Sequence, residues 1–140
     1  MNASSPPVGY SGTPLVKKLG IKANSELCVI DVPDNYPALL APLPDGVRTV
    51  TTFAPSADLV HLFVTLRIDL ATTLALIRAE LKADGVVWVS WPKKASKAAT
   101  DITEDIIRAV ALPMGFVDIK VCAVDEKWSG LKLVIRRALR

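Results

Sequence analysis

The chain has 140 residues, of which 51% are hydrophobic and 22% are charged, and its formal net charge at pH 7 is +3. This composition is typical of one globular domain and excludes a disordered chain. The charge excess is small and the longest basic cluster lies at the C-terminal tail, so a nucleic-acid partner is not expected.

Membrane attachment and metal binding are not expected either. No run approaches the roughly 18 apolar residues of a membrane-spanning helix, and residues 1 to 7 lack the basic and apolar regions of a signal peptide. Cys28 and Cys122 lie among apolar neighbours, which favours buried free thiols over a disulfide. A single histidine and no paired Cys/His spacing leave no ligand set for a metal. The sequence therefore predicts a cytoplasmic protein.

The first elements follow an irregular arm. Residues 1 to 12 are rich in Ser, Pro and Gly, and a single domain is expected from residue 13 to residue 140. Thr13-Pro14 begins a short helix that Gly20 ends, with a cap residue first and glycine after the last turn. Apolar and β-branched runs then predict three strands, at residues 26 to 32, 48 to 53 and 58 to 64. A weak helix at residues 36 to 41 follows the first of these strands.

The clearest helix spans residues 67 to 82. Its apolar side chains recur at steps of three and four and form one stripe for a sheet to cover: Leu70, Leu74, Ile77 and Leu81. Asp84-Gly85 ends this helix and leads into the most apolar strand, residues 86 to 91, which is expected to be buried.

The C-terminal part of the chain predicts one more helix and a hairpin. The helix begins at Asp101, and Glu104 three residues later completes a pair similar to a capping box. Two strands, residues 117 to 123 and 131 to 135, flank a turn and are expected to pair antiparallel. The apolar side of the first of them is Val117, Ile119, Val121 and Ala123.

Strands that alternate with helices predict an α/β, Rossmann-like domain, a mostly parallel sheet with helices on both faces and a C-terminal antiparallel hairpin. This order resembles the class I methyltransferase form of that sheet, which ends in such a hairpin. The local match is best in Ala57-Asp58-Leu59-Val60 and Leu81-Lys82-Ala83-Asp84-Gly85-Val86-Val87, which are similar to the superfamily's "DLV … L-K-P-G-G" segment. The resemblance implies a methyltransferase-like scaffold and carries no chemistry by itself.

The turn after the first strand departs from that superfamily. The resemblance implies a glycine-rich turn there, which lets the backbone approach S-adenosylmethionine. Here Val29-Ile30-Asp31 is followed by Val32-Pro33-Asp34-Asn35 without glycine, and the second strand ends in Thr51-Thr52-Phe53 without an acid for a ribose. Asp31 matches a position that is often acidic in the superfamily. We therefore expect neither S-adenosylmethionine nor another cofactor.

Three further segments resemble an uncharacterised family of small bacterial proteins, a domain of unknown function: Gly9-Tyr10-Ser11-Gly12-Thr13-Pro14-Leu15, Trp91-Pro92-Lys93-Lys94-Ala95-Ser96 and Val121-Cys122-Ala123-Val124-Asp125-Glu126-Lys127-Trp128-Ser129-Gly130-Leu131. The resemblance extends over nearly the whole chain. The family has no assigned activity, so the resemblance implies no site residues.

The candidate site lies where the buried, tryptophan-containing strand gives way to polar residues. Lys93, Lys94 and Ser96 follow that strand, and Asp31 and Asp34 follow the first strand. The expected sheet order makes these two strands neighbours, with their carboxyl ends at one crevice. The lysines and carboxylates then form either an ion-pair cluster that fills the crevice or a site for a phosphate or carboxylate.

Four other residues have two interpretations each. Tyr10 folds over the crevice from the arm, or it packs beside the first helix. Trp128 and Glu126, on the hairpin turn, bind a protein partner or form a packed strand edge. His61 lies within an apolar strand and is either a core histidine or a catalytic one. The sequence leaves these alternatives open.

These observations favour a non-catalytic binding module on a methyltransferase-like scaffold, acting through a protein partner or a small anionic ligand. The alternative is an enzyme that acts on a small phosphate- or carboxylate-bearing substrate at the crevice of Lys93 and Lys94. A third interpretation is a methyltransferase with an unusual cofactor site. The discriminating feature is whether the crevice near Asp31 and Lys93 is open or filled.

Overall fold

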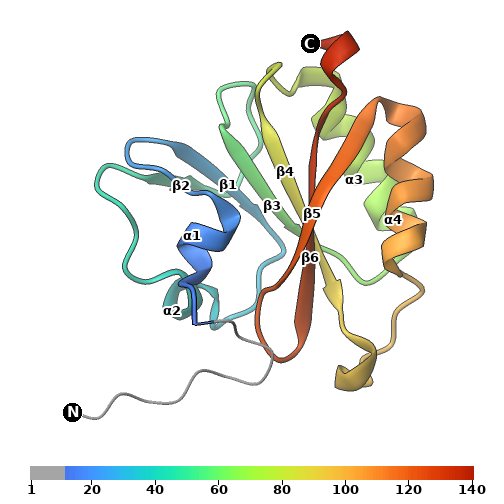
Figure 1. Cartoon of the computed structure of the whole chain (residues 1–140), viewed down its shortest axis with the longest axis horizontal. Coiled ribbons are helices and arrows are strands. Elements are labelled where there is room, and N and C mark those ends of the chain that lie inside the picture. The colour runs from blue at the N-terminus through green and yellow to red at the C-terminus, as the bar shows by residue number, and fades with distance from the viewer. Residues whose placement is uncertain (1–11) are drawn as a thin grey trace.

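The computed structural model describes residues 12–140, so the expected arm, apart from its last residue, lies outside the described residues. A six-stranded sheet forms the centre of this part of the chain (Figure 1). The strands are β1 Glu26–Ile30, β2 Arg48–Val50, β3 Leu59–Phe63, β4 Val86–Pro92, β5 Phe116–Ala123 and β6 Trp128–Ile135. The α-helices are α1 Leu15–Leu19, α2 Tyr36–Leu40, α3 Arg67–Glu80 and α4 Glu104–Ala111, and 3-10 turns lie at Lys94–Ser96, Leu112–Met114 and Arg137–Leu139. None of the helices between residues 12 and 140 is long and apolar enough to cross a membrane.

The strand order across the sheet is β2-β1-β3-β4-β6-β5. β2, β1, β3 and β4 run parallel, whereas β6 runs antiparallel to both β4 and β5. The expected α/β, Rossmann-like class is therefore confirmed, including the mostly parallel sheet and the C-terminal antiparallel hairpin.

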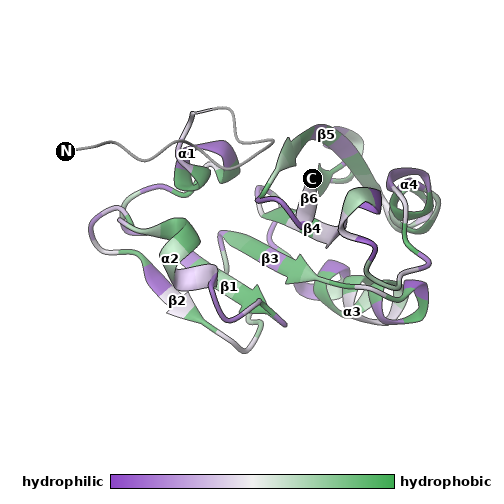
Figure 2. Ribbon diagram, turned by 90° about the horizontal axis from the view of Figure 1, so that it is seen from below, coloured by the Kyte–Doolittle hydropathy of each residue, from purple (hydrophilic) through white to green (hydrophobic). Residues whose placement is uncertain are grey.

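Helices cover both faces of the sheet (Figure 2). α3 and α4 pack on one face, and α1 and α2 pack on the other. The stripe expected on the long helix is confirmed, because Leu70 and Leu74 are fully buried and Ile77 is only 1% exposed. These side chains meet the apolar residues of β3 and β4 and form the larger part of the core.

A hydrogen bond ties α1 to the centre of the sheet. The Nε1 of Trp88 in β4 donates to the carbonyl oxygen of Leu19 at 2.9 Å. α1 ends immediately afterwards at Gly20, whose φ of +77° is the left-handed conformation that glycine adopts without strain. The expected end of the first helix is confirmed.

The expectation that β1 and β4 are neighbours is wrong, because β3 lies between them. Cys28 of β1 pairs with Val60, and Trp88 of β4 pairs with His61. All five residues of β3 are buried. A strand that is buried along its whole length is covered on both faces and belongs in the middle of a parallel sheet, and β3 therefore takes the position between the two candidate strands.

The start of α4 also differs from the expectation. Thr103 caps this helix, since its Oγ1 accepts from the backbone N–H of Ile106 at 3.2 Å. Asp101 has another role: its Oδ1 accepts from the backbone N–H of Arg67 at 2.7 Å, at the first residue of α3. The carboxylate thus supports the N-terminus of a different helix from the one that the sequence predicts.

A β-bulge breaks the expected alternation of β5. The register shifts between Asp118, which pairs with Leu133, and Lys120, which pairs with Lys132. One additional residue in a strand moves the following side chains to the other face. Ile119 is 53% exposed and Val121 is 48% exposed, so the expected apolar side of this strand is wrong at both positions.

Candidate functional site

A cavity of about 250 Å³ opens at the carboxyl ends of β1 and β3. We call it the crevice, and its lining residues are Asp31, Phe63, Val64, Thr65, Asp69 and Trp128. Asp31 follows β1, and Val64 and Thr65 follow β3. Asp69 lies in the first turn of α3, and Trp128 is the first residue of β6. Open α/β sheets bind ligands at this edge, which makes the crevice the candidate functional site.

Asp31 forms the turn by which the chain leaves β1. Its φ of +55° lies in the left-handed region, which aspartate adopts more readily than most residues other than glycine. The side chain is exposed, and Val32 and Pro33 follow it. The backbone therefore turns on a carboxylate at the position where the resemblance implies a glycine-rich turn.

Aromatic rings form one wall of the crevice. The ring of Trp128 packs edge-to-face on Phe63, with centroids 5.0 Å apart and planes at 83°. The Nζ of Lys127 lies 5.4 Å from the centroid of the Trp128 ring. Trp128 is only 8% exposed, so of the two interpretations of this residue the structure favours the packed one. The Trp128 side chain contributes to the crevice from within the core.

A buried polar chain lies behind this wall. Tyr36 Oη is 2.7 Å from Nδ1 of His61, and Nε2 of His61 is 2.7 Å from Oγ of Ser90. The His61 and Ser90 side chains are fully buried, and burial lowers the pKa of His61 to about 3. The imidazole is therefore neutral, with one ring nitrogen donating and the other accepting. His61 is a satisfied core histidine.

Lys93, Lys94 and Ser96 lie beside the hairpin. The backbone N–H of Lys93 donates to the carbonyl oxygen of Lys127 at 2.8 Å. Lys94 and Ser96 belong to the following 3-10 turn, where the Ser96 hydroxyl donates to the carbonyl oxygen of Lys93 at 2.7 Å. This lysine turn is adjacent to Trp128, but its side chains are not part of the crevice lining.

The structure does not bring the lysines and the aspartates of the sequence hypothesis into contact. Within residues 12–140, no ion pair joins Lys93 or Lys94 to Asp31 or Asp34. The intervening β3 accounts for this separation. The crevice is therefore not filled by the ion-pair cluster that was one of the two expected arrangements.

The remaining candidates divide by position. Glu126 is exposed on the hairpin turn. Its neighbour Asp125 has a structural role, since Oδ1 accepts from the backbone N–H groups of Lys127 and Trp128, both at 2.8 Å. Tyr10 lies outside the described residues.

Both cysteines are free thiols, as expected. Cys28 is buried and Cys122 is half-buried. Burial raises the pKa of the Cys28 thiol, with a further contribution from Glu26, and burial also raises the pKa of the Cys122 thiol against the opposing effect of nearby lysines. Both side chains are therefore protonated at neutral pH, which makes them poor nucleophiles.

Phe63, Thr65 and Asp69 line the crevice but were not among the predicted site residues. The signal for two of them was present in the sequence. Thr65 and Asp69 follow an apolar strand in the same way as Lys93 follows the next one. Only the position of β3 in the sheet brings that strand end to the crevice.

No protein-family model and no curated protein matches the chain. Solved methyltransferase structures do. The chain is similar to an S-adenosylmethionine-dependent methyltransferase from Aquifex aeolicus, with a TM-score of 0.64 and 11% identity over 86% of this chain and 87% of that one. It is similar to magnesium protoporphyrin IX methyltransferase from Synechocystis PCC 6803, solved with S-adenosylmethionine bound, with a TM-score of 0.55 and 11% identity over 87% of this chain and 74% of that one.

A third similar structure is LepI in complex with S-adenosylmethionine, with a TM-score of 0.56 and 13% identity. The match covers 97% of this chain and 50% of LepI, so the chain spans half the length of that protein. Identities this low show the fold alone. The chain has a methyltransferase-like Rossmann fold.

Proposed function

We propose that the chain is a non-catalytic binding module on a methyltransferase-like scaffold, and that its crevice binds a cationic group of a partner instead of S-adenosylmethionine. The observation that carries the proposal is the lining of the crevice, where two carboxylates, Asp31 and Asp69, stand with the rings of Phe63 and Trp128. Carboxylates bind an ammonium or guanidinium group by charge-assisted hydrogen bonds, and aromatic rings attract the same groups.

The size of the crevice supports a group rather than a whole cofactor. Its volume of about 250 Å³ lies below the range of roughly 300–1,000 Å³ that is common for small-molecule sites. Pro33 in the turn after β1 has no backbone N–H to donate and cannot adopt the positive φ of a glycine turn. One lysine or arginine side chain fits these dimensions better than an adenosine-bearing cofactor does.

The state of the reactive side chains supports a non-catalytic role. His61 is neutral and buried, with both ring nitrogens engaged. Burial keeps the thiols of Cys28 and Cys122 protonated by raising the pKa of each. These three residues therefore supply neither a general base nor a thiolate nucleophile at neutral pH.

The lysine turn fits a protein partner at the rim of the crevice. Lys93 is bonded to the hairpin next to Trp128, and Lys94 and Glu126 are exposed. A partner that inserts a basic side chain beside Asp31 presents its flanking acidic residues to these lysines. The alternative, an enzyme for an anionic substrate at Lys93 and Lys94, has less support because these side chains do not line the crevice.

The cytoplasmic location belongs to the same proposal and is supported by the two free cysteines, which are usual in reducing compartments. We also propose that the chain belongs to the uncharacterised bacterial family named above. The support for this membership is the resemblance of the three sequence segments.

Calorimetry with two ligands tests the proposal. We expect the amide of N-acetylarginine to bind and S-adenosylmethionine at millimolar concentration to give no binding heat. Asp69→Asn should weaken arginine binding about tenfold, because asparagine has the shape of aspartate but no negative charge to pair with the guanidinium group. Asp31→Asn should do the same, since asparagine also adopts the left-handed φ of this position.

Asp34→Asn is the matched control, because Asp34 is exposed three residues after Asp31 and does not line the crevice. It makes the same change in net charge and should leave arginine binding unchanged. Equal effects of the three substitutions would overturn the cation site. A micromolar affinity for S-adenosylmethionine that Asp31→Asn weakens would make the protein a cofactor-binding methyltransferase relative.

A further inference from the structure

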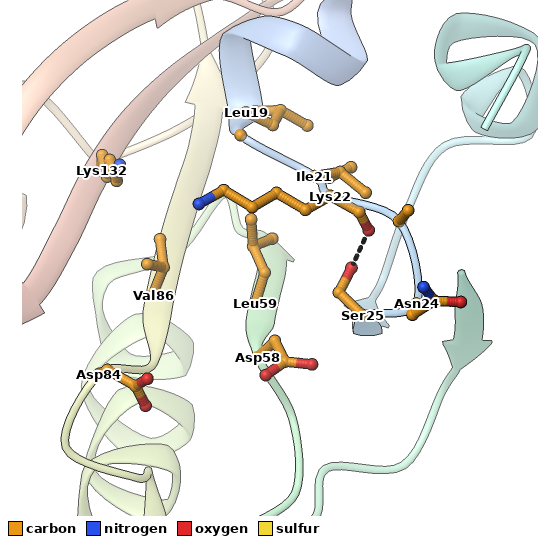
Figure 3. Close-up of a pocket in the computed structure, with 12 residues that line it drawn as sticks. Leu19, Ile21, Lys22, Asn24, Ser25, Asp58, Leu59, Asp84, Val86 and Lys132 are labelled. Carbon is orange, nitrogen blue, oxygen red and sulfur yellow. Dashed lines mark hydrogen bonds between the residues drawn. The ribbon is translucent and has the colours of Figure 1, made fainter. Parts of the chain in front are cut away.

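A second cavity, of about 470 Å³, lies at the opposite end of the sheet (Figure 3). We call it the amino-end pocket. The loop of residues 20–25 precedes β1 and forms one side, and Asp58, Asp84 and Val86 mark the starts of β3 and β4. Lys132 of β6 completes the lining. The proposed function uses none of these residues.

Two lysines, Lys22 and Lys132, line this pocket, and Lys120 stands next to Lys132 on the neighbouring strand. Lys132 pairs directly with Lys120 across β5 and β6. Like charges that face one another on adjacent strands destabilise a sheet. Lys22 is the third, and its extended side chain runs across Leu59 toward the strand that carries Val86, with Lys132 beyond it (Figure 3).

The bulge in β5 creates this arrangement. Without the register shift between Asp118 and Lys120, the strand would present Lys120 to the opposite face from Lys132. The burial of Lys132 lowers the pKa of its ammonium group, and the charges of Lys120 and Lys22 lower it further. Within residues 12–140, none of the three forms an ion pair. The cluster therefore carries an uncompensated positive charge.

The other side of the pocket has a different character. Asp58 is already engaged, because Oδ2 accepts from the backbone N–H of Glu26 at 2.7 Å and Oδ1 is paired with Lys82. Asp84 is exposed and lines the pocket opposite the lysines. A carboxylate accepts hydrogen bonds from hydroxyl groups and repels phosphates. A ligand that fits both sides has an anionic end and a neutral, hydroxyl-bearing end.

We propose that the amino-end pocket binds a small phosphorylated, hydroxyl-bearing molecule, such as a sugar phosphate, with its phosphate at Lys22, Lys120 and Lys132 and its hydroxyls toward Asp84. A phosphate monoester carries a charge between −1.5 and −2 at neutral pH. Such a ligand suits three ammonium groups better than a ligand with one carboxylate group does. The cavity volume lies within the range that is common for small-molecule sites. A nucleic-acid strand fits less well, because the carboxylates of Asp58 and Asp84 also line the pocket and repel further phosphates.

Calorimetry with ribose 5-phosphate, inorganic phosphate and a single-stranded oligonucleotide tests this site. We expect ribose 5-phosphate to bind more tightly than inorganic phosphate. Lys132→Gln and Lys22→Gln should each weaken ribose 5-phosphate binding about tenfold or more, as the loss of a charged phosphate contact predicts. Lys22 lies on an exposed loop, so its substitution leaves the core intact. Asp84→Asn should weaken ribose 5-phosphate binding and should not weaken inorganic phosphate binding.

Lys94→Gln is the matched control, because it removes the same charge from an exposed turn at the other end of the sheet. It should leave ribose 5-phosphate binding unchanged. Equal losses in Lys132→Gln, Lys22→Gln and Lys94→Gln would overturn the site, and so would the absence of saturable binding by either phosphate compound. Tighter binding of the oligonucleotide than of ribose 5-phosphate, weakened by Lys94→Gln as well, would replace the pocket by a nucleic-acid surface.

Discussion

The two ends of the sheet present opposite chemistry. At the carboxyl end, the crevice of about 250 Å³ combines the carboxylates of Asp31 and Asp69 with aromatic rings. At the amino end, a pocket of about 470 Å³ includes Lys22 and Lys132. The methyltransferase-like fold determines where strand ends meet, but the loops and the bulge of this chain determine which charge each end presents.

The two sites also differ in how closely they are joined to the core. Phe63, a wall of the crevice, is 2% exposed and contacts Tyr36, His61 and Trp128 through ring packing. Lys22 at the amino-end pocket is exposed. Substitutions at the crevice wall should therefore change stability strongly, whereas substitutions of the pocket lysines should mainly change binding.

The largest effect is expected at the crevice wall. Phe63→Ala should lower the free energy of unfolding by about 3–5 kcal/mol, because it leaves a cavity among three aromatic neighbours. Urea denaturation followed by tryptophan fluorescence measures the loss. Leu74→Ala on the opposite face is the control: it should cost about 2–5 kcal/mol and leave arginine binding unchanged. A loss below about 1 kcal/mol for Phe63→Ala would show that the wall is not part of the core.

The buried chain behind the wall predicts the next effect. The pKa of His61 is about 3 in the folded protein and 6.5 without the effect of burial, so between these values the unfolded state binds the extra proton. Stability is therefore complete above pH 6.5 and should fall by about 1 kcal/mol for each pH unit below it. Asp58 and Asp118, whose pKa values are lowered by ion pairing, stabilise the fold above their unfolded pKa of 3.8, and this stabilisation is lost as the pH falls below that value.

Urea denaturation between pH 7 and pH 5.5 isolates the contribution of His61, because carboxyl groups with ordinary pKa values near 4 stay ionised in that window. Unchanged stability across the window would contradict the neutral, buried imidazole. An independent check is the His61 ring proton signal by NMR, which should not titrate while the protein stays folded.

A smaller effect of opposite sign is expected at the amino end. Without ligand, Lys132→Gln should raise the free energy of unfolding by about 0.2–1 kcal/mol, because it removes a like charge facing Lys120. Thermal unfolding in low salt measures the gain, which added salt should reduce. A loss of stability instead would mean that the Lys132 ammonium group is compensated and that the pocket has no need of an anion.

The smallest effect is expected for the ion pair of Asp58 and Lys82, which lies at the edge of the same pocket. Lys82→Gln should lower stability by at most about 1 kcal/mol, since both side chains are more than one third exposed. Ribose 5-phosphate titration should give the wild-type affinity. A large loss of affinity would place the phosphate beside Lys82 rather than beside Lys132.

The sequence predicted the elements of the fold better than their neighbours. The stripe of the long helix, the buried strand with Trp88 and the closing hairpin were all visible as periodic or apolar patterns. Periodicity does not record which strands are adjacent, so the position of β3 was not predicted. The predicted cap residue of α4 was wrong, because Asp101 and Thr103 are both suitable N-cap residues. Only the packing of the folded chain places Asp101 at the N-terminus of α3.

The candidate site was only partly predicted, because the sequence does not show which strand ends are adjacent. The hypothesis selected Asp31 and Trp128 for separate roles, and the structure brings both to one crevice. It paired Asp31 with Lys93, which β3 prevents. The lysines near the amino-end pocket were not predicted as a cluster. The bulge that brings Lys120 opposite Lys132 cannot be recognised in the sequence pattern of β5.

One NMR titration tests directly whether the two ends bind different charges, with the indole N–H signals of Trp128 and Trp88 as reporters. Trp128 lines the crevice, and Trp88 donates to Leu19, which lines the amino-end pocket. We predict that N-acetylarginine amide shifts the Trp128 signal alone, that ribose 5-phosphate shifts the Trp88 signal alone, and that S-adenosylmethionine shifts neither. A saturating shift of Trp128 by S-adenosylmethionine, without one by the arginine compound, would contradict the account.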